Sequence, residues 1–149
     1  MRPGRPNKAA SSFFSAIVRE PLLGLAAELP VPDDFPVWVA SPRRAVDWLL
    51  HAATLDTAPM ALDRSVNLPG LSVRVGEIIA ALEQVQPGAS AHVHRVPDPA
   101  IAAIVGTWPT GFEAKRGRAL GFAVHEPLVD LVHAFVVDDL EATRRERGL

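Results

Sequence analysis

The sequence predicts an α/β fold that is rich in helix and has a few short strands. A short apolar segment, Ser65 to Leu68, runs into Pro69-Gly70, and a helix follows. The apolar residues of that helix recur at i, i+3, i+4 and i+7, which marks one helical face: Val75, Ile78, Ile79, Leu82 and Val85. A strand that feeds a helix is typical of α/β architecture, because the helix lays its apolar face on a sheet that needs further strands. Few further strands are indicated, so the sheet should be small.

The first part of the chain predicts one helix and two strands. A helix is expected over 9–19, where apolar residues recur at helical spacing, and it should end near Pro21. Segments 26–31 and 35–40 are rich in residues that favour strands. The turn residues Pro32-Asp33-Asp34 lie between them, so the two strands are placed to form a small hairpin.

Ser41-Pro42 is a strong start signal for a second helix. The serine accepts a hydrogen bond from a free amide of the first turn, and proline occupies that turn without losing a needed donor. The helix should run to about Thr54. It is expected to bury six residues: Ala45, Val46, Trp48, Leu49, Ala52 and Ala53.

Later elements follow from caps and turns. Ser72 is expected to cap the helix of the central unit, and residues 92–96 form a short strand. Asp98-Pro99 repeats the pattern of a cap followed by proline and predicts another helix. Residues 112–120 should form one short helix. The last helix should start around Glu126-Pro127, and its polar end should fray.

Length and composition indicate one globular, soluble domain. The chain has 149 residues, of which 48% are hydrophobic and 21% are charged, and this composition excludes a disordered polypeptide. A net charge of −2 gives no general attraction for nucleic acid or anionic lipid. The chain has no cysteine, which excludes disulfides and thiolate chemistry and fits a cytoplasmic setting. It also has no tyrosine, so no phenolic acid or base is available.

Most familiar site motifs are missing. No glycine-rich dinucleotide loop or phosphate loop occurs among the ten glycines. His92 and His94 share one face of the expected strand, but no third metal ligand lies nearby in the sequence, so a surface strand is the better interpretation. Asn7, Lys8 and Ser11 stand at a helix N-terminus, which suits a carboxylate or phosphate. A simple capped helix explains them equally well.

Four stretches of the chain are similar to sequence motifs of a known protein family: Arg2-Pro3-Gly4-Arg5-Pro6-Asn7-Lys8-Ala9, Trp38-Val39-Ala40-Ser41-Pro42-Arg43, Ser65-Val66-Asn67-Leu68-Pro69-Gly70-Leu71-Ser72-Val73 and Ala119-Leu120-Gly121-Phe122. Together they resemble the C-terminal portion of the extended short-chain dehydrogenases, the NAD-dependent epimerase/dehydratase family. The first three also resemble its D-erythronate dehydrogenase branch in detail. The resemblance covers nearly the whole chain.

The resemblance implies a single incomplete substrate-binding domain over residues 1–149. The family carries its glycine-rich NAD loop and its Tyr-x-x-x-Lys catalytic pair in an N-terminal half, and this sequence contains neither. NAD is the cofactor of the family, and none is expected to bind this chain alone. Most of the Rossmann sheet would lie in the N-terminal half. The apolar face of 75–85 would then lack a sheet and be open to association.

By position, the resemblance implies six substrate-binding residues: Asn7, Lys8, Ser11, Trp38, Arg43 and Arg116. The arginine fork can hold a carboxylate with two hydrogen bonds, so Arg43 is the better clamp and Lys8 the better point charge. Arg116 matches a charged position in the helix that ends in Leu-Gly. No residue of the chain is expected to be catalytic, to bind a cofactor or to hold a metal.

Three functions are compatible with this pattern. The chain would be the substrate-binding part of an NAD-dependent dehydrogenase that oxidises a sugar acid such as D-erythronate, inactive alone. Its parent would otherwise be a nucleotide-sugar epimerase or dehydratase, against which the missing His-Val-x-Asp motif argues. The third hypothesis is a non-catalytic module that docks on a separate Rossmann-fold partner or on itself. No nucleic-acid or membrane partner is expected.

Overall fold

The computed structural model of the chain describes residues 3–5, 7, 9–60, 62–124 and 127–149. Its helices are α1 (Ser12–Leu22), α2 (Pro42–Thr54), α3 (Val75–Val85), α4 (Pro99–Val105), α5 (Lys115–Ala119), α6 (Leu128–Asp138) and α7 (Leu140–Arg147). Its strands are β1 (Ala27–Leu29), β2 (Pro36–Val39), β3 (Leu71–Arg74) and β4 (Val93–Arg95). Short 3-10 turns lie at Ala58–Met60 and Ala89–His92. The prediction of a helix-rich α/β fold with few short strands is confirmed.

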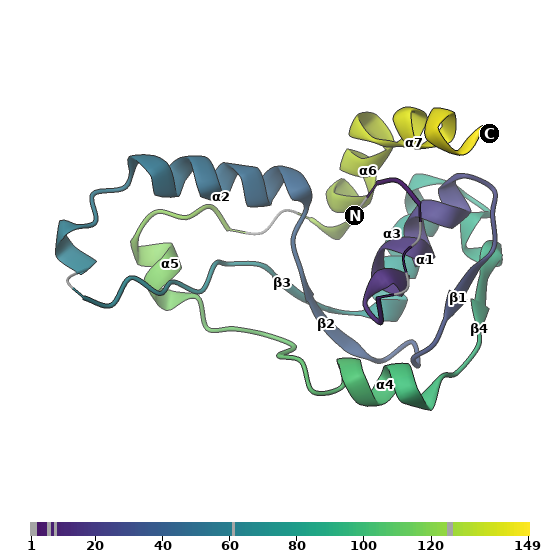
Figure 1. Cartoon of the computed structure of the whole chain (residues 1–149), viewed down its shortest axis with the longest axis horizontal. Coiled ribbons are helices and arrows are strands. Elements are labelled where there is room, and N and C mark those ends of the chain that lie inside the picture. Colours follow the sequence, from purple (N-terminus) through teal and green to yellow (C-terminus); the bar gives the residue numbers. More distant parts are fainter. Residues whose placement is uncertain (1–2, 6, 8, 61, 125–126) are drawn as a thin grey trace.

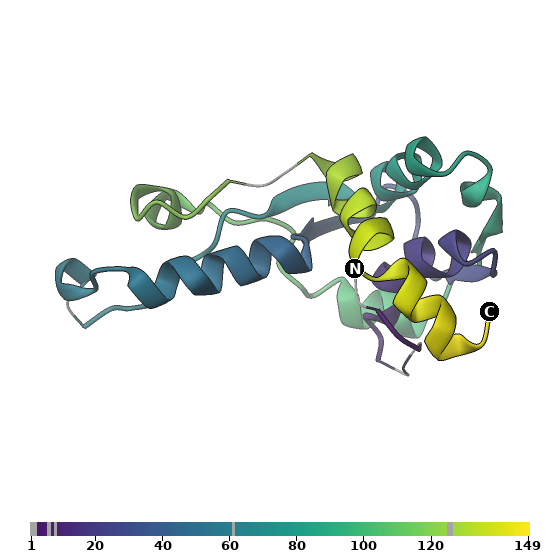
Figure 2. The same cartoon turned by 90° about the horizontal axis from the view of Figure 1, so that it is seen from above.

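The molecule has a body and an arm (Figure 1). The body contains α1, α3, α6 and α7 together with the pair of strands β1 and β4. The arm, residues 42–60, 62–70 and 111–124, contains α2 and α5 and reaches away from the body. Figure 2 shows the same elongated arm from above. Strands β2 and β3 lie where the arm joins the body, so they connect the two parts.

Each strand pairs with a strand that is distant in the sequence. β1 pairs in parallel with β4, with Ala27 opposite Val93. β2 pairs antiparallel with β3, with Val39 opposite Leu71. Both pairs form two-stranded sheets, and each therefore leaves strand edges without a partner among the described residues.

The predicted hairpin between segments 26–31 and 35–40 is wrong. The turn between them bonds to the first turn of α3, where the amide of Gly76 donates to the carbonyl oxygen of Asp33 at 2.7 Å. A Cβ added at Gly76 would lie 3.1 Å from that oxygen, so the two backbones approach closely. Because α3 holds the turn, β1 and β2 diverge and join different sheets.

Residues 65–68 do not form the predicted strand. Strand β3 begins instead at Leu71 and leads directly into α3. A strand needs a neighbour with which to exchange backbone hydrogen bonds, and no strand of the described part of the chain runs beside 65–68. The segment is therefore left as a connection along the arm.

Two of the three predicted helix caps are confirmed. The hydroxyl of Ser41 accepts a hydrogen bond from the amide of Arg44 at 3.0 Å. The carboxylate of Asp98 accepts one from the amide of Ala100 at 2.8 Å. The third prediction is wrong, because Ser72 lies within β3 and does not cap α3. Local cap chemistry is thus a good guide wherever proline also marks the first turn.

The apolar face of α3 is buried inside this chain. Its residues Val75, Ile78, Ile79 and Leu82 are at most 5% exposed. Helices α1 and α6 pack against α3 and cover this face. The expectation that the face lacks a partner is therefore wrong. Each buried aliphatic side chain contributes ~1.5–3 kcal/mol by transfer from water, so α3 is central to stability.

The polar end of the chain does not fray as predicted, because it forms α7 and docks on α1. Arg147 pairs with the carboxylate of Glu20, which also accepts from Nε of Arg19 at 2.8 Å. Arg144 donates to the carbonyl oxygen of Leu22 at 3.4 Å. Arg19 and Glu20 are only 2% and 4% exposed. Buried charges persist when they are paired, so this cluster fixes the last helix to the body.

Helix α2 agrees with its predicted bounds but not with its predicted burial. Trp48 is buried, with 4% of its surface exposed. The other five residues predicted to be buried are exposed. Among the apolar residues of this helix, Val46, Leu49 and Leu50 are 53%, 70% and 64% exposed. The arm therefore carries an apolar helix face that nothing in the described chain covers.

Candidate functional site

A cavity of about 310 Å³ lies between the body and the base of the arm. It is lined by one side of α1, the whole of β2 and the segment that follows α4, including Phe14, Ser15, Trp38, Trp108 and Thr110. This volume reaches the lower end of the range of small-molecule sites. The rings supply apolar walls, and Ser15 and Thr110 are the residues of the lining that carry a hydroxyl group. No charged side chain is among the described residues that line it.

Trp38 is the predicted site residue that the structure places in this cavity. Its ring stacks near Trp48, with 6.5 Å between ring centroids, and meets the edge of Phe112 at 5.2 Å. A Cβ added at Gly70 would lie 2.3 Å from Cζ2 of Trp38, so the missing side chain of Gly70 leaves room for this ring. The Trp38 ring is thus held in one orientation.

The N-terminal residues predicted to bind substrate are only partly described. The side-chain oxygen of Asn7 accepts a hydrogen bond from the amide of Ala9 at 3.1 Å. Ser11 precedes α1, and its side chain makes no cap hydrogen bond. Lys8 lies outside the described residues. Phe14, one turn further along α1 than Ser11, lines the cavity, so α1 leads from these positions to the candidate site.

Arg43 binds a carboxylate of its own chain. Its guanidinium donates from Nε and Nη2 to the two oxygens of Asp138 at the end of α6. This paired geometry lowers the pKa of Asp138 from its ordinary value, chiefly through the hydrogen bond from Arg43. The side chains of Arg43 and Asp138 are 52% and 39% exposed, so solvent reaches both. An incoming carboxylate would compete with Asp138, and the role of Arg43 as a clamp stays a prediction.

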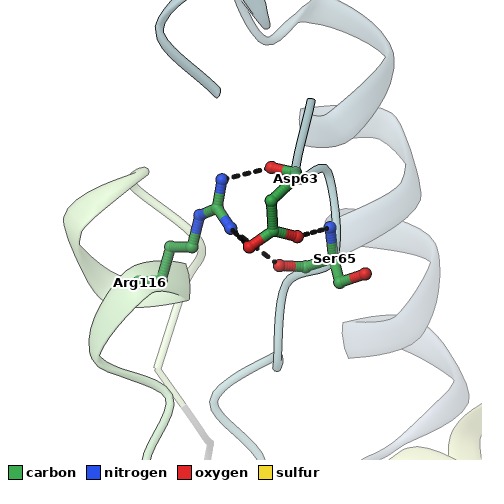
Figure 3. A network of polar contacts seen from close by, with 3 residues as sticks. All are labelled: Asp63, Ser65 and Arg116. Atoms are coloured by element: carbon green, nitrogen blue, oxygen red, sulfur yellow. Dashed lines mark hydrogen bonds and ion pairs between the residues drawn. The ribbon is translucent and has the colours of Figure 1, made fainter. Parts of the chain in front are cut away.

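Arg116 of α5 forms hydrogen bonds with Asp63 and Ser65 of the arm (Figure 3). Its guanidinium donates to the carboxylate of Asp63 at 2.6 Å, to the carbonyl oxygen of Asp63, and to the carbonyl oxygen of Ser65 at 3.2 Å. The Asp63 carboxylate also accepts from the amide of Ser65 at 3.0 Å. These contacts give Arg116 a structural position, and its predicted contact with substrate remains a prediction.

The contacts around Asp63 predict a pH dependence of the arm. The hydrogen bond from the Ser65 amide, followed by that from Arg116, lowers the pKa of Asp63 from its ordinary 3.8. The stabilisation is therefore present above pH 3.8 and is lost as the pH falls through the lowered folded value. An NMR titration of the carboxyl should show this low pKa. In Arg116→Ala the pKa should rise part of the way, and an unchanged titration would contradict the contacts.

The described residues do not fit a bound NAD. Dinucleotide sites place a glycine-rich turn between a strand and a helix, where backbone amides approach the pyrophosphate. Here β3 leads into α3 at Val75 with no turn between them, β2 is joined to α2 through Ala40 and Ser41, and β4 is joined to α4 through residues 96–98. None of these three junctions of the described residues contains a glycine.

No group of three or more His, Cys, Asp or Glu side chains that could hold a metal ion lies among the described residues. His92 ends a 3-10 turn and His94 lies in β4, so the two histidines do not share one strand face. None of the helices in the described part is long and apolar enough to cross a membrane.

The sequence predicts one aromatic residue at this site, Trp38, whereas the structure brings several together there. All three tryptophans of the chain are there, since Trp38 and Trp108 line the cavity and Trp48 stacks near Trp38. No local pattern groups them, because they lie on β2, on α2 and on the segment after α4. Asp138, the partner of Arg43, also had no local signal, because 95 residues separate the two in the sequence.

Known proteins with similar sequences and a similar fold match nearly the whole chain. The chain is 43% identical to D-erythronate dehydrogenase of Cupriavidus necator over 93% of its own length, and 38% identical to D-erythronate dehydrogenase of Haemophilus influenzae over 94%. A solved structure named as a nucleoside-diphosphate-sugar epimerase from Agrobacterium tumefaciens matches 94% of the chain with 45% identity and a TM-score of 0.88. The chain has the fold of the C-terminal part of an extended short-chain dehydrogenase.

This extended short-chain dehydrogenase fold recurs at lower sequence identity. L-threonine 3-dehydrogenase from Trypanosoma brucei shares it, with 17% identity and a TM-score of 0.79 over 99% of the chain. The chain spans 43% and 45% of the length of the two D-erythronate dehydrogenases, and 41% of the Agrobacterium structure. No model of a protein family matches it. The resemblance seen in the sequence motifs is confirmed.

Proposed function

We propose that this chain is the substrate-binding part of an NAD-dependent dehydrogenase that oxidises a sugar acid such as D-erythronate. It is a single incomplete domain and does not catalyse the reaction alone. The observation that carries the proposal is the similarity to two D-erythronate dehydrogenases over nearly the whole chain, at 43% and 38% identity. That similarity includes the regions of Trp38 and Arg43.

The chain supplies orientation in this proposal. The cavity beside Trp38 receives the carbon skeleton of a small substrate, and Arg43 exchanges Asp138 for the substrate carboxylate. Oxidation of a hydroxy acid also needs a base for the hydroxyl proton and an acceptor for the hydride. The family places both in an N-terminal half, and this chain has no tyrosine to serve as the base.

A nucleotide-sugar epimerase is the second candidate. It is favoured by the Agrobacterium tumefaciens structure, a protein named as such an epimerase, which matches the chain with 45% identity. The cavity of about 310 Å³ favours a smaller substrate such as a sugar acid, because a nucleotide sugar needs more space.

A chimera separates these candidates. The matched region of the Cupriavidus necator D-erythronate dehydrogenase is replaced by this chain, and the purified protein is supplied with NAD⁺. NADH formation with D-erythronate and no conversion of nucleotide sugars is the expected result. Conversion of a nucleoside-diphosphate sugar without oxidation of D-erythronate would favour the epimerase. The parental enzyme serves as the positive control.

In the same chimera, Arg43→Ala is expected to raise KM for the acid by about tenfold or more, since a charged hydrogen bond contributes about 1.5–3 kcal/mol. The affinity for NAD should change little, because the proposed contact is with the acid. Asp138→Ala is the matched control: it breaks the same pair but leaves the guanidinium in place. Steady-state kinetics on both variants give the test. An equal rise of KM in the two variants would mean that Arg43 only connects α2 to α6 and does not bind the acid.

A further inference from the structure

Ser72 does not cap α3, and the structure gives its hydroxyl another partner. The residue lies in β3, and its Oγ donates to the carbonyl oxygen of Thr110 at 2.7 Å. The two residues are 38 positions apart in the sequence. A Cβ added at Gly111 would lie 3.5 Å from the same Oγ, so the backbone of 110–111 passes directly beside Ser72. Thr110 also lines the cavity of about 310 Å³, which connects Ser72 to the candidate site.

The sheet of β2 and β3 has two faces with different neighbours. In its ladder Trp38 stands opposite Ser72, and Val37 stands opposite Val73. Residues directly opposite each other in an antiparallel pair project on the same side of the sheet, and successive residues project on opposite sides. Val37 and Val73 are buried in the core of the body, so Trp38 and Ser72 project away from that core.

The connection 106–114 leads from α4 on the body to α5 on the arm (Figure 1). It forms neither helix nor strand, so its side-chain contacts decide where it lies. Three of its residues line the cavity and are called the wall segment here: Trp108, Pro109 and Thr110. The position of the wall segment therefore sets how much room a substrate has.

Contacts hold the connection before and after its hydrogen bond to β3. The ring of Trp108 lies 6.3 Å from the ring of Phe14 of α1, measured between centroids. Further along, the rings of Phe112 and Trp38 meet edge to face at 5.2 Å. The hydrogen bond from Ser72 lies between these two ring contacts along the connection. A hydrogen bond has a defined length and direction, so Ser72 specifies the position of the wall segment more narrowly than the rings do.

We propose that Ser72 is a positioning residue of the substrate site: by holding Thr110, it fixes the wall segment and restricts the cavity to a short acid. Ser72 acts through the wall segment, since it is not among the described residues that line the cavity. Without the hydroxyl the wall segment moves outward, so a short acid makes fewer contacts and a longer acid gains room. This inference rests on the proposed function, because it requires that the cavity receives a sugar acid.

The test compares three variants of the chimera, numbered as in this chain. Ser72→Ala removes the hydroxyl, and Ser72→Thr keeps it. Ser65→Ala is the matched control, because Ser65 is an exposed serine that enters the contacts of Figure 3 through its backbone. Steady-state kinetics are measured with D-erythronate and with the longer acid D-gluconate.

Ser72→Ala is expected to raise KM for D-erythronate about fivefold, the effect of one neutral hydrogen bond. The kcat and the KM for NAD⁺ should change little, because the base and the hydride acceptor belong to the other half. The preference for D-erythronate over D-gluconate, taken as the ratio of their kcat/KM values, should fall by a similar factor. Ser72→Thr should restore both quantities, and Ser65→Ala should leave them unchanged.

A second measurement follows the wall segment without any substrate. The chain has three tryptophans, so labelling with fluorotryptophan gives a simple fluorine NMR spectrum, and Trp108→Phe assigns the signal of the wall segment. In the chain alone, the Trp108 signal is expected to shift in Ser72→Ala and to keep its position in Ser65→Ala. An unchanged Trp108 signal in Ser72→Ala would overturn the positioning role.

The two proposals fail separately in these experiments. A shifted Trp108 signal, with a chimera that does not oxidise D-erythronate, would keep Ser72 as the residue that places the wall segment and reject the substrate. Oxidation of D-erythronate with the same KM in Ser72→Ala as in the unaltered chimera would keep the function and overturn the positioning role. A fall in kcat alone, or a loss that Ser72→Thr does not restore, would overturn it as well.

Discussion

Replacement of Glu20 by alanine is expected to lower the free energy of unfolding by ~3–5 kcal/mol, because it breaks a buried ion pair by removing the carboxylate that both Arg19 and Arg147 contact. Glu20 is 4% exposed and also holds Arg147 of α7. Its loss therefore disturbs two elements, the end of α1 and the last helix. Urea unfolding of the whole chain, followed by circular dichroism, measures the change.

Glu141→Ala is the matched control for this experiment, since Glu141 is an exposed glutamate of α7. Its effect should be within about 0.5 kcal/mol, as for most surface substitutions. Equal effects of the two variants would mean that the cluster of Arg19, Glu20 and Arg147 adds nothing to stability.

Replacement of Leu82 by alanine is expected to cost ~2–5 kcal/mol, the range for deleting a large aliphatic side chain from a packed core. Leu82 has no exposed surface, and α3 packs against both α1 and α6. The cavity left behind would lie where the three helices meet. The same urea experiment measures the loss, and Leu82→Met, which nearly keeps the volume, should cost below about 1.5 kcal/mol.

A loss below about 1 kcal/mol for Leu82→Ala would contradict the packing of α3 within this chain. It would favour the expectation from the sequence, in which the face of 75–85 stays open until a sheet covers it. The experiment therefore also decides which helix of the chain lacks a partner.

Local signals in the sequence predicted much of the fold. Ser41-Pro42 and Asp98-Pro99 marked the starts of α2 and α4, because a cap and a proline act within one turn of the chain. The strand pairs were not predictable in this way. β1 pairs with β4 and β2 with β3 across long stretches of sequence, and no local pattern specifies such a partner.

The helix periodicity was correct, but it does not say which neighbour covers a helix. The apolar residues of α3 and of α2 both recur at helical spacing, yet α1 and α6 bury those of α3, whereas Val46, Leu49 and Leu50 of α2 are exposed. At the site, family resemblance selected Trp38, which lies in the cavity. It could not indicate that Arg43 pairs with Asp138, since that contact depends on how α6 meets α2.

The central claim is that these 149 residues orient a substrate but hold neither the catalytic base nor the cofactor site. The most direct test is NADH formation by the purified chain alone, supplied with D-erythronate and NAD⁺, beside the chimera under the same conditions. We expect NADH from the chimera and none above the buffer rate from the chain. Turnover by the chain alone, lost in a variant such as Arg43→Ala, would contradict the claim.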